Sequence, residues 1–134
     1  MIKIIDNFFN EHDLQNVQNF ALTKAFYTPQ YFNNTTEKNK QNYYGNRWEL
    51  KNNVKLKQFK PHQDSPDGII NIMIMIKGIT AVTNGTVFYN RDKDNLQLDT
   101  HIGFRENRAI LFPSDHWHSQ HASDIPDMIR YSAT

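Results

Sequence analysis

The feature that most constrains the fold is the succession of short apolar segments between residue 54 and the C-terminus. Val54 and Leu56 alternate with lysines, as the residues of a half-buried strand do. Turn-forming residues, including those at 84–85 and 105–107, separate the segments and indicate turns between strands. The run at 69–76 is almost continuously Ile and Met, which is typical of a strand buried on both faces. The further segments with strand character are 86–89, 96–98, 101–104, 109–112 and 129–133.

The first 25 residues predict a short strand followed by a helix. Residues 1–5 have strand character, and Asn10 has the type and position of a helix N-cap. Glu11 and Asp13 would lie near the positive end of the helix dipole, and apolar residues at helical spacing continue to about residue 25. The chain is therefore predicted to be mainly β with an N-terminal helix. Seven or eight strands would form a two-sheet roll or barrel, with the helix packed outside.

Residues 28–53 are rich in turn formers and contain scattered aromatic residues. They predict one long loop with a short strand near 47–50. A loop of this length inside a compact domain is usually functional or mobile.

Length and composition limit the classes of protein to which the chain can belong. A chain of 134 residues predicts a single domain, 1–134, and a net charge of +1 gives no electrostatic reason to expect nucleic acid or an anionic membrane as a partner. The absence of cysteine excludes a disulfide scaffold, a thiolate zinc site and a cysteine nucleophile. The apolar runs are too short for a signal peptide or a membrane span, so we expect a cytoplasmic protein.

His62 and Asp64 have the chemistry of metal ligands. On an extended segment, residues two apart direct their side chains to the same face. Pro61 restricts the chain just before them, and a tight turn follows at 65–68. A metal ion requires such convergence of an imidazole and a carboxylate from a stiff backbone. Alternatively, Asp64 caps the turn that follows it.

Three histidines, His116, His118 and His121, fall within six residues near the C-terminus. His118 follows the predicted strand 109–112 and the turn 113–115, which places it at the mouth of the roll, where a third metal ligand would be needed. His116 would share a face of an extended segment with His118, and His121 would lie on the other face. The alternative is that all three are polar residues of a solvent-exposed loop.

Arg130 lies within the apolar C-terminal strand at 129–133. An arginine that faces a core needs an anionic partner, because burying it unpaired is costly. Its planar guanidinium suits a carboxylate, and Ser132, two residues further on and hence on the same face, can donate to the same carboxylate. The alternative is an outward-facing arginine on an edge strand.

Together, His62-x-Asp64, His118 and Arg130-x-Ser132 resemble the Fe(II)/2-oxoglutarate-dependent oxygenase superfamily, and more narrowly its small prolyl-4-hydroxylase-like branch. The resemblance implies that His62, Asp64 and His118 bind Fe(II). It implies that Arg130, helped by Ser132, binds the distal carboxylate of 2-oxoglutarate. The implied fold is a double-stranded β-helix, also called a jelly roll, which is cupin-like.

The implied activity is that of a dioxygenase that acts as a hydroxylase. It uses O2 and converts 2-oxoglutarate to succinate and CO2 while a hydroxyl group enters the substrate. The branch suggests a prolyl or other peptide side chain as substrate, and a small molecule is the alternative. The protein would be a monomer or a homodimer.

The resemblance covers residues 54–134 well, including 85–89 and 107–114, and residues 1–25 loosely. Many relatives have a tyrosine for 2-oxoglutarate shortly before the His-x-Asp motif, where this chain has Phe59. Asn71 or one of the tyrosines would have to take that role. Residues 28–53 match nothing in the branch. They are either a substrate lid, with Tyr43, Tyr44, Arg47 and Trp48 as candidate contacts, or a packed aromatic segment without such a role.

Two other classes of protein remain open. One is a cupin-like metal enzyme that does not use 2-oxoglutarate, against which the Arg130-x-Ser132 pair argues because that pair needs an acid to bind. The other is a non-catalytic β-roll used for binding or assembly. The complete set of candidate metal and co-substrate ligands argues against it.

Overall fold

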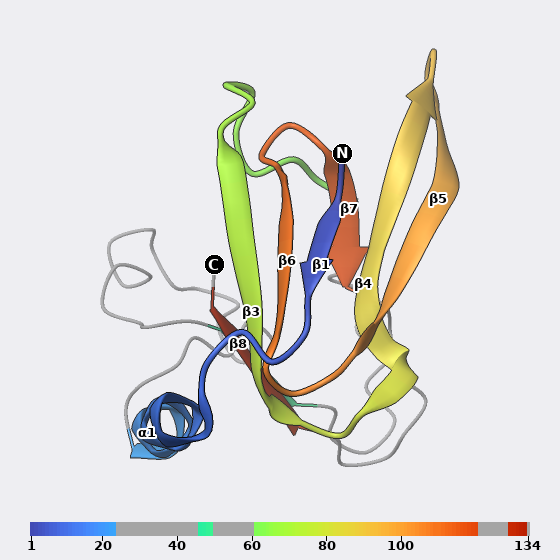
Figure 1. Ribbon diagram of the computed structural model, residues 1–134. Helices are drawn as coiled ribbons and strands as arrows, with labels where there is room; N and C mark the ends of the chain where they lie inside the picture. Colours follow the sequence, from blue (N-terminus) through green and yellow to red (C-terminus); the bar gives the residue numbers. More distant parts are fainter. Residues whose placement is uncertain (24–45, 50–60, 121–128, 134) are drawn as a thin grey trace, which may run out of the picture.

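The computed structural model describes residues 1–23, 46–49, 61–120 and 129–133. Within these ranges the chain forms one helix and eight strands, and the strands build two antiparallel sheets (Figure 1). The predicted class, mainly β with an N-terminal helix, is confirmed. The elements in chain order are β1 (Lys3–Ile5), α1 (Glu11–Thr23), β2 (Asn46–Glu49), β3 (Ile70–Gly78), β4 (Ala81–Asp92), β5 (Asn95–Phe104), β6 (Arg108–Pro113), β7 (Trp117–Gln120) and β8 (Ile129–Ala133).

The two sheets differ in size and in strand order. Among the described strands, the larger sheet has the order β1-β6-β3-β8-β2 and the smaller sheet has the order β5-β4-β7. β4 and β5 form a long hairpin whose tip extends beyond the ends of the neighbouring strands (Figure 1). An isolated antiparallel bridge between His62 and His118 adds a further chain segment beside β7, on the side away from β4. Among the described residues no helix has the length and apolar character needed to cross a membrane.

The main core is made by residues of both sheets. Phe88 of β4 and Phe112 of β6 meet edge to face, with their ring centroids 5.1 Å apart, so that the two sheets are packed against each other. The buried residues of this core are Met73, Met75, Phe88, Ile102, Phe104, Ile110 and Phe112.

The prediction that 69–76 would be buried on both faces is wrong for the first half of β3. Ile70 and Ile72 are 58% and 42% exposed, whereas Met73 is buried in the core. The outer face of the larger sheet is covered by α1 only further along, where Ala21 packs with Ile76. The burial of β3 on its second face therefore depends on how far the helix extends over the sheet.

The start of α1 follows the sequence prediction. The N–H of Asp13 donates to Oδ1 of Asn10 at 2.8 Å, which is the expected N-cap hydrogen bond. The first turn carries Glu11 and Asp13 near the positive end of the helix dipole. The predicted end of the helix, near residue 25, lies outside the described residues.

Asn107, in the predicted turn at 105–107, attaches the N-terminal segment to the sheets. It has a left-handed backbone conformation with φ 65°, and its N–H donates to the carbonyl of Met75 at 2.8 Å. The N–H of Phe9 donates to its Oδ1 at 2.8 Å, and its Nδ2 donates to the Phe9 carbonyl at 2.9 Å. The side chain is buried, so these hydrogen bonds fix the chain just before α1.

The predicted turn at 84–85 does not form, because β4 runs through it, and the predicted strands 96–98 and 101–104 are one continuous strand, β5. A Cβ atom on Gly85 would lie 1.9 Å from the carbonyl oxygen of Ile102 in β5. The pairing of β4 with β5 also shifts register between Ala81 and Thr86. The glycine therefore marks a close approach of two strands at an irregularity of the ladder, and not a turn.

Candidate metal centre

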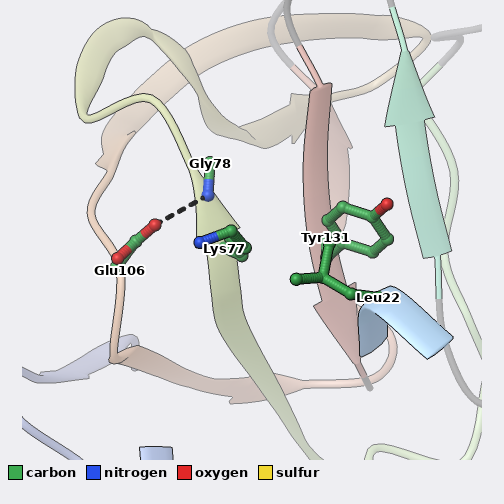
Figure 2. A pocket seen from close by; sticks show the side chains of 5 residues that line it. All are labelled: Leu22, Lys77, Gly78, Glu106 and Tyr131. Carbon is green, nitrogen blue, oxygen red and sulfur yellow. Dashed lines mark hydrogen bonds between the residues drawn. The ribbon is translucent and has the colours of Figure 1, made fainter. Parts of the chain in front are cut away.

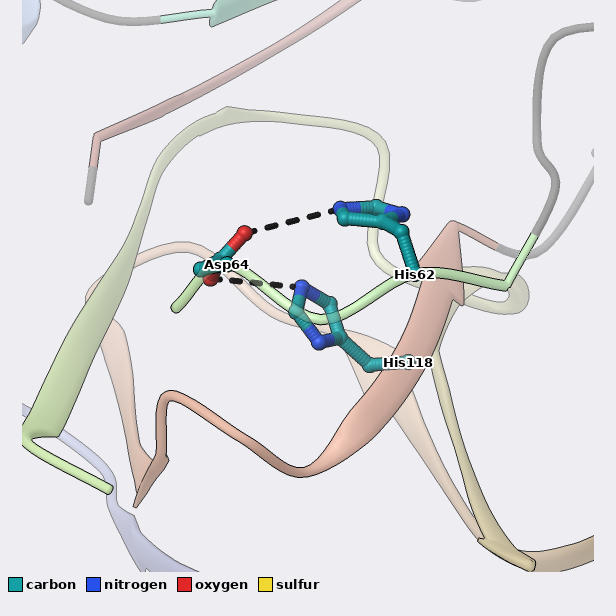
Figure 3. A group of neighbouring side chains, drawn as sticks. All are labelled: His62, Asp64 and His118. Carbon is teal, nitrogen blue, oxygen red and sulfur yellow. Dashed lines mark ion pairs between the residues drawn. The ribbon is translucent and has the colours of Figure 1, made fainter. Parts of the chain in front are cut away.

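The structure brings His62, Asp64 and His118 together (Figure 3). One ligand atom from each residue can be chosen so that all three lie within 4.8 Å of one another. Nε2 of His62 is 3.6 Å from Oδ1 of Asp64, and Nε2 of His118 is 3.5 Å from Oδ2. The three residues that the sequence singled out as candidate metal ligands thus form one group, close to the start of β3.

Two backbone hydrogen bonds hold the two histidines opposite each other. The N–H of His62 donates to the carbonyl of His118 at 2.9 Å, and the N–H of His118 donates back to the carbonyl of His62 at 2.9 Å. Directly opposed residues of an antiparallel pair direct their side chains to the same face. The imidazole rings accordingly lie side by side, with centroids 4.5 Å apart.

Asp64 is held by the turn that precedes His118. The N–H groups of Asp64 and Ser65 both donate to the carbonyl of Ser114, at 2.9 and 3.2 Å. Ser114 is buried, and its own N–H donates to the carbonyl of Ile69 at 2.7 Å. The turn after Asp64 is closed by Ser65, whose Oγ accepts from the N–H of Asp67 at 3.3 Å. The carboxylate of Asp64 is thereby free to face the histidines instead of capping that turn.

A hydrogen bond fixes the orientation of the His118 ring. Its Nδ1 lies 2.9 Å from the carbonyl oxygen of His116, and because a carbonyl can only accept, Nδ1 carries the proton. In the neutral ring the lone pair is then on Nε2, the nitrogen that faces Asp64. Hydrogen bonding of the second imidazole nitrogen to a carbonyl is the usual way in which proteins orient a histidine ligand.

Burial keeps His118 in the form that binds metals. The residue is 5% exposed, and its ring lies against those of Phe88 and Phe112. This burial lowers the pKa of His118 below its usual value, against the opposing effects of the His116 carbonyl and the Asp64 charge. A neutral imidazole can bind a metal ion near neutral pH without first losing a proton.

Asp64 is the anionic residue of the group. The imidazole of His62 lowers the pKa of the Asp64 carboxyl, partial burial opposes this, and His118 and the amide of Asn71 lower it further. The side chain of His62 is 56% exposed and that of Asp64 is 35% exposed, so the group opens to solvent on one side. Two imidazoles and one carboxylate that leave the remaining positions open are the donor set of non-haem Fe(II) centres, and the residues therefore fit such an ion.

The other two histidines of the C-terminal motif have different positions. His116 is outside the group: its ring packs against Phe88 at 5.4 Å, and it contributes its carbonyl to His118. His121 lies outside the described residues. The sequence did not reveal this role of the His116 backbone, because every residue has a carbonyl and the contact depends on the rotamer of His118.

The candidate co-substrate residues are described only in part. Ser132 is 3% exposed and pairs with Met75, so it lies on the buried side of β8. The backbone of Arg130 pairs with Gly78 at the far end of β3, and its side chain is outside the described part of the structure. Met75, the residue opposite Ser132, is four positions along β3 from Asn71, which corresponds to about 13 Å.

Most of the predicted loop 28–53 lies outside the described residues, as does Phe59. The exception is β2, which contains Arg47 and Trp48 and pairs with β8 in the larger sheet. A short strand was predicted near this position. The role of the loop as a substrate lid stays a prediction.

A cleft of about 350 Å³ lies between α1, β3 and β8, which contribute Leu22, Gly78 and Tyr131 to its lining (Figure 2). Glu106 joins its walls, because its carboxylate accepts from the N–H of Gly78 at 3.1 Å and from Nε2 of Gln18 at 3.2 Å. The carboxylate is thus already engaged in linking the helix to the end of β3. The residues that line the cleft are Leu22, Lys77, Gly78, Glu106 and Tyr131.

No family model matches the chain, and no curated protein matches it.

Proposed function

We propose that the protein is an Fe(II)- and 2-oxoglutarate-dependent oxygenase that hydroxylates its substrate. The observation that carries this proposal is the convergence of His62, Asp64 and His118, whose ligand atoms lie within 4.8 Å of one another. The fixed tautomer of His118 supports it, because Nε2 of that ring is already directed at the position a shared ion would occupy. This donor set with open positions is typical of oxygenases that use Fe(II).

The fold we propose is a double-stranded β-helix, the cupin-like jelly roll. The order in which the chain visits the sheets supports it: β3 is in the larger sheet, β4 and β5 in the smaller, β6 in the larger, β7 in the smaller and β8 in the larger. A chain wound as a double-sheet roll alternates between its two sheets in this way. The bridge from His62 to His118 would continue the smaller sheet at its β7 edge.

With Fe(II), 2-oxoglutarate and O2 bound, the centre would supply hydroxylation, in which one oxygen atom enters a C–H bond of the substrate and the other enters succinate, with release of CO2. His62, Asp64 and His118 would hold the metal. Arg130 and Ser132 would bind the distal carboxylate of 2-oxoglutarate, and the burial of Ser132 on β8 is consistent with an internal site for that acid.

The substrate we propose is a peptide side chain, such as a prolyl residue, or a small molecule. The exposed side of His62 supports access by either one, because the metal group is not enclosed on that side. The inner side of the group is apolar: Phe88 and Phe112 pack against His118 and would exclude water there.

The test is anaerobic titration of the Fe(II)-loaded protein with 2-oxoglutarate, followed by visible absorption. We expect a weak metal-to-ligand charge-transfer band that saturates with the co-substrate. Iron binding without such a band would favour a cupin-like metal enzyme that does not use 2-oxoglutarate. Failure to bind iron would remove the proposed activity and favour a non-catalytic β-roll.

A further inference from the structure

Asn71 makes a side-chain hydrogen bond to the carboxylate of the metal group. Its Nδ2 donates to Oδ2 of Asp64 at 2.6 Å. The same oxygen lies 3.5 Å from Nε2 of His118, while Oδ1 lies 3.6 Å from Nε2 of His62. The amide therefore contacts the carboxylate at the centre of the group, whereas sequence analysis named Asn71 only as a candidate for 2-oxoglutarate binding.

The histidines cannot orient this carboxylate once they bind a metal ion. The proton of His118 is on Nδ1 and is used by the His116 carbonyl, so its Nε2 has no hydrogen to donate. His62 would likewise have no proton on the nitrogen that it gives to the metal. Among the side chains that the structure describes, Asn71 is then the one left to donate a hydrogen bond to Asp64.

The backbone of Asn71 is well placed to give the carboxylate a fixed orientation. Asn71 is the second residue of β3 and pairs with Phe112 of β6, so its main chain belongs to the ladder of the larger sheet. The Asp64 side chain, by contrast, extends from the connection before β3 and is 35% exposed. The Asn71 amide is on a strand and hydrogen-bonds to a carboxylate on a connecting segment. The sheet therefore restricts the movement of that carboxylate.

We infer that Asn71 is a positioning residue of the metal centre, which holds the Asp64 carboxylate in the orientation that a metal ion needs. The inference rests on the proposed metal-binding function and assigns Asn71 a role different from that of a 2-oxoglutarate ligand. Asn71 acts through Asp64 and contacts neither the metal nor the co-substrate.

The experiment is titration of the metal-free protein with Co²⁺ in the absence of 2-oxoglutarate, followed by calorimetry and by the visible absorption of the bound ion. We expect Asn71→Ala to raise the dissociation constant about 10- to 100-fold, the usual effect of removing a group that orients a ligand. Asn71→Leu, which keeps most of the volume but has no donor, is expected to behave in the same way. Asn90→Ala, at an exposed asparagine of β4, is the matched control and is expected to bind like the wild type.

Three further measurements separate positioning from other roles. The apo variants should melt at the temperature of the wild type, and at saturating metal their affinity for 2-oxoglutarate should be unchanged. In an Asp64→Ala background, Asn71→Ala should cause no further loss of the residual Co²⁺ affinity, because the group through which it acts is missing.

The outcomes distinguish the inference from the proposed function. If the wild type binds Co²⁺ and Asn71→Ala binds it equally well, the inference is wrong and the proposed function stands. The inference is also overturned if Asn71→Ala weakens only the binding of 2-oxoglutarate, since Asn71 would then be a co-substrate ligand. If the wild type itself binds no metal ion, both the inference and the proposed function are wrong.

Discussion

The proton on Nδ1 of His118 decides which nitrogen of that ring can reach a metal ion. The main-chain carbonyl of His116, two residues earlier, accepts a hydrogen bond from this N–H and so keeps the proton on Nδ1. The His116 ring packs against Phe88, and His116 is not among the three residues whose ligand atoms lie together. His118 thus offers a ring nitrogen to a metal ion, whereas His116 offers its main-chain carbonyl to the ring of His118.

This division gives a matched pair of variants. His118→Ala removes a ligand and is expected to abolish stoichiometric Fe(II) binding at pH 7. His116→Ala keeps the carbonyl that orients His118, so it should retain the metal. Metal content after gel filtration measures both, with circular dichroism as the check on folding. Loss of iron in His116→Ala together with retention in His118→Ala would mean that the wrong histidine has been assigned.

Arg130→Ala tests the co-substrate half of the proposal. Loss of a charge-assisted bidentate contact costs about 1.5–3 kcal/mol, so the affinity for 2-oxoglutarate should fall by about 10- to 100-fold. Fe(II) binding should remain as in the wild type, because no metal ligand is changed. The charge-transfer titration measures both quantities, and an unchanged affinity for 2-oxoglutarate would exclude Arg130 from the site.

Asp6 and Arg108 form a bidentate ion pair between the N-terminal segment and β6. Arg108 donates from Nε to Oδ1 at 2.7 Å and from Nη2 to Oδ2 at 3.0 Å. The hydrogen bond from Arg108 lowers the pKa of the Asp6 carboxyl below its ordinary value of 3.8; burial opposes this, and the charges of Arg108 and Arg105 lower the pKa further. A lowered pKa in the folded state means that the pair stabilises the fold above pH 3.8, and that this contribution is lost as the pH falls through the folded-state pKa.

Asp6→Asn is therefore expected to lower the free energy of unfolding near neutral pH by no more than about 1 kcal/mol, because the pair is partly exposed to solvent. The difference from the wild type should shrink as the solution is acidified, since the wild-type carboxyl is then also neutral. Urea unfolding at pH 7 and at progressively lower pH measures this. A difference that stays constant over the whole range would contradict the assignment.

At the scale of secondary-structure elements, the connection between β5 and β6 also serves as the attachment site of the N-terminal segment. Asn107 supplies both functions, because its left-handed backbone makes the turn and its amide bonds the main chain of Phe9 in both directions. Asparagine tolerates this backbone conformation better than most residues, and its side chain has the donor and the acceptor that the segment requires.

Asn107→Ala is expected to lower the free energy of unfolding by about 2–4 kcal/mol, because it leaves buried groups unpaired and adds backbone strain. Asn107→Gly loses the same side-chain hydrogen bonds without the strain, and should be less destabilising than the alanine variant. Urea denaturation compares them. If both variants were as stable as the wild type, the N-terminal segment would not depend on Asn107.

Some elements can be read from the sequence because their signals are local. The N-cap at Asn10, the turn at 105–107 and the strand at 129–133 all depend on residues within a few positions, and all three are present in the structure. The turn predicted at 84–85 failed because Gly85 accommodates a carbonyl of another strand, which local sequence does not report. The exposure of Ile70 and Ile72 likewise depends on the reach of a helix elsewhere in the chain.

At the scale of the whole molecule, the candidate metal ligands come from segments associated with both sheets. Asp64 belongs to the connection that leads into β3 of the larger sheet, while His118 belongs to β7 of the smaller sheet. A bound ion would link them, and a ligand that binds only the folded state stabilises that state.

Saturation of the wild type with metal at 100 times the dissociation constant is expected to raise the free energy of unfolding by about 2.7 kcal/mol. The melting temperature should rise by several degrees and return to its original value with a chelator. His118→Ala should not respond to the metal, which makes it the control. An equal rise in that variant would mean that the ion binds elsewhere.

Only part of the candidate site can be predicted from the sequence. The spacing of His62 and Asp64 places both on one face of an extended segment, and the resemblance to the oxygenases then names His118 as the third ligand. The amide of Asn71 could not be recognised as a partner of Asp64, because that contact exists only once the chain has turned back into β3. The sheet orders also remained undetermined, since strand neighbours are set by pairings between distant segments.

The paired main-chain hydrogen bonds between His62 and His118 have a consequence for how a metal would be captured. Both amide hydrogens are enclosed in the pair, so their exchange with deuterated solvent reports how often the two segments separate. Slow exchange in the metal-free protein would mean that the ligands are assembled during folding. The entropy cost of ordering them would then belong to folding, and capture of the ion would require no rearrangement of the chain.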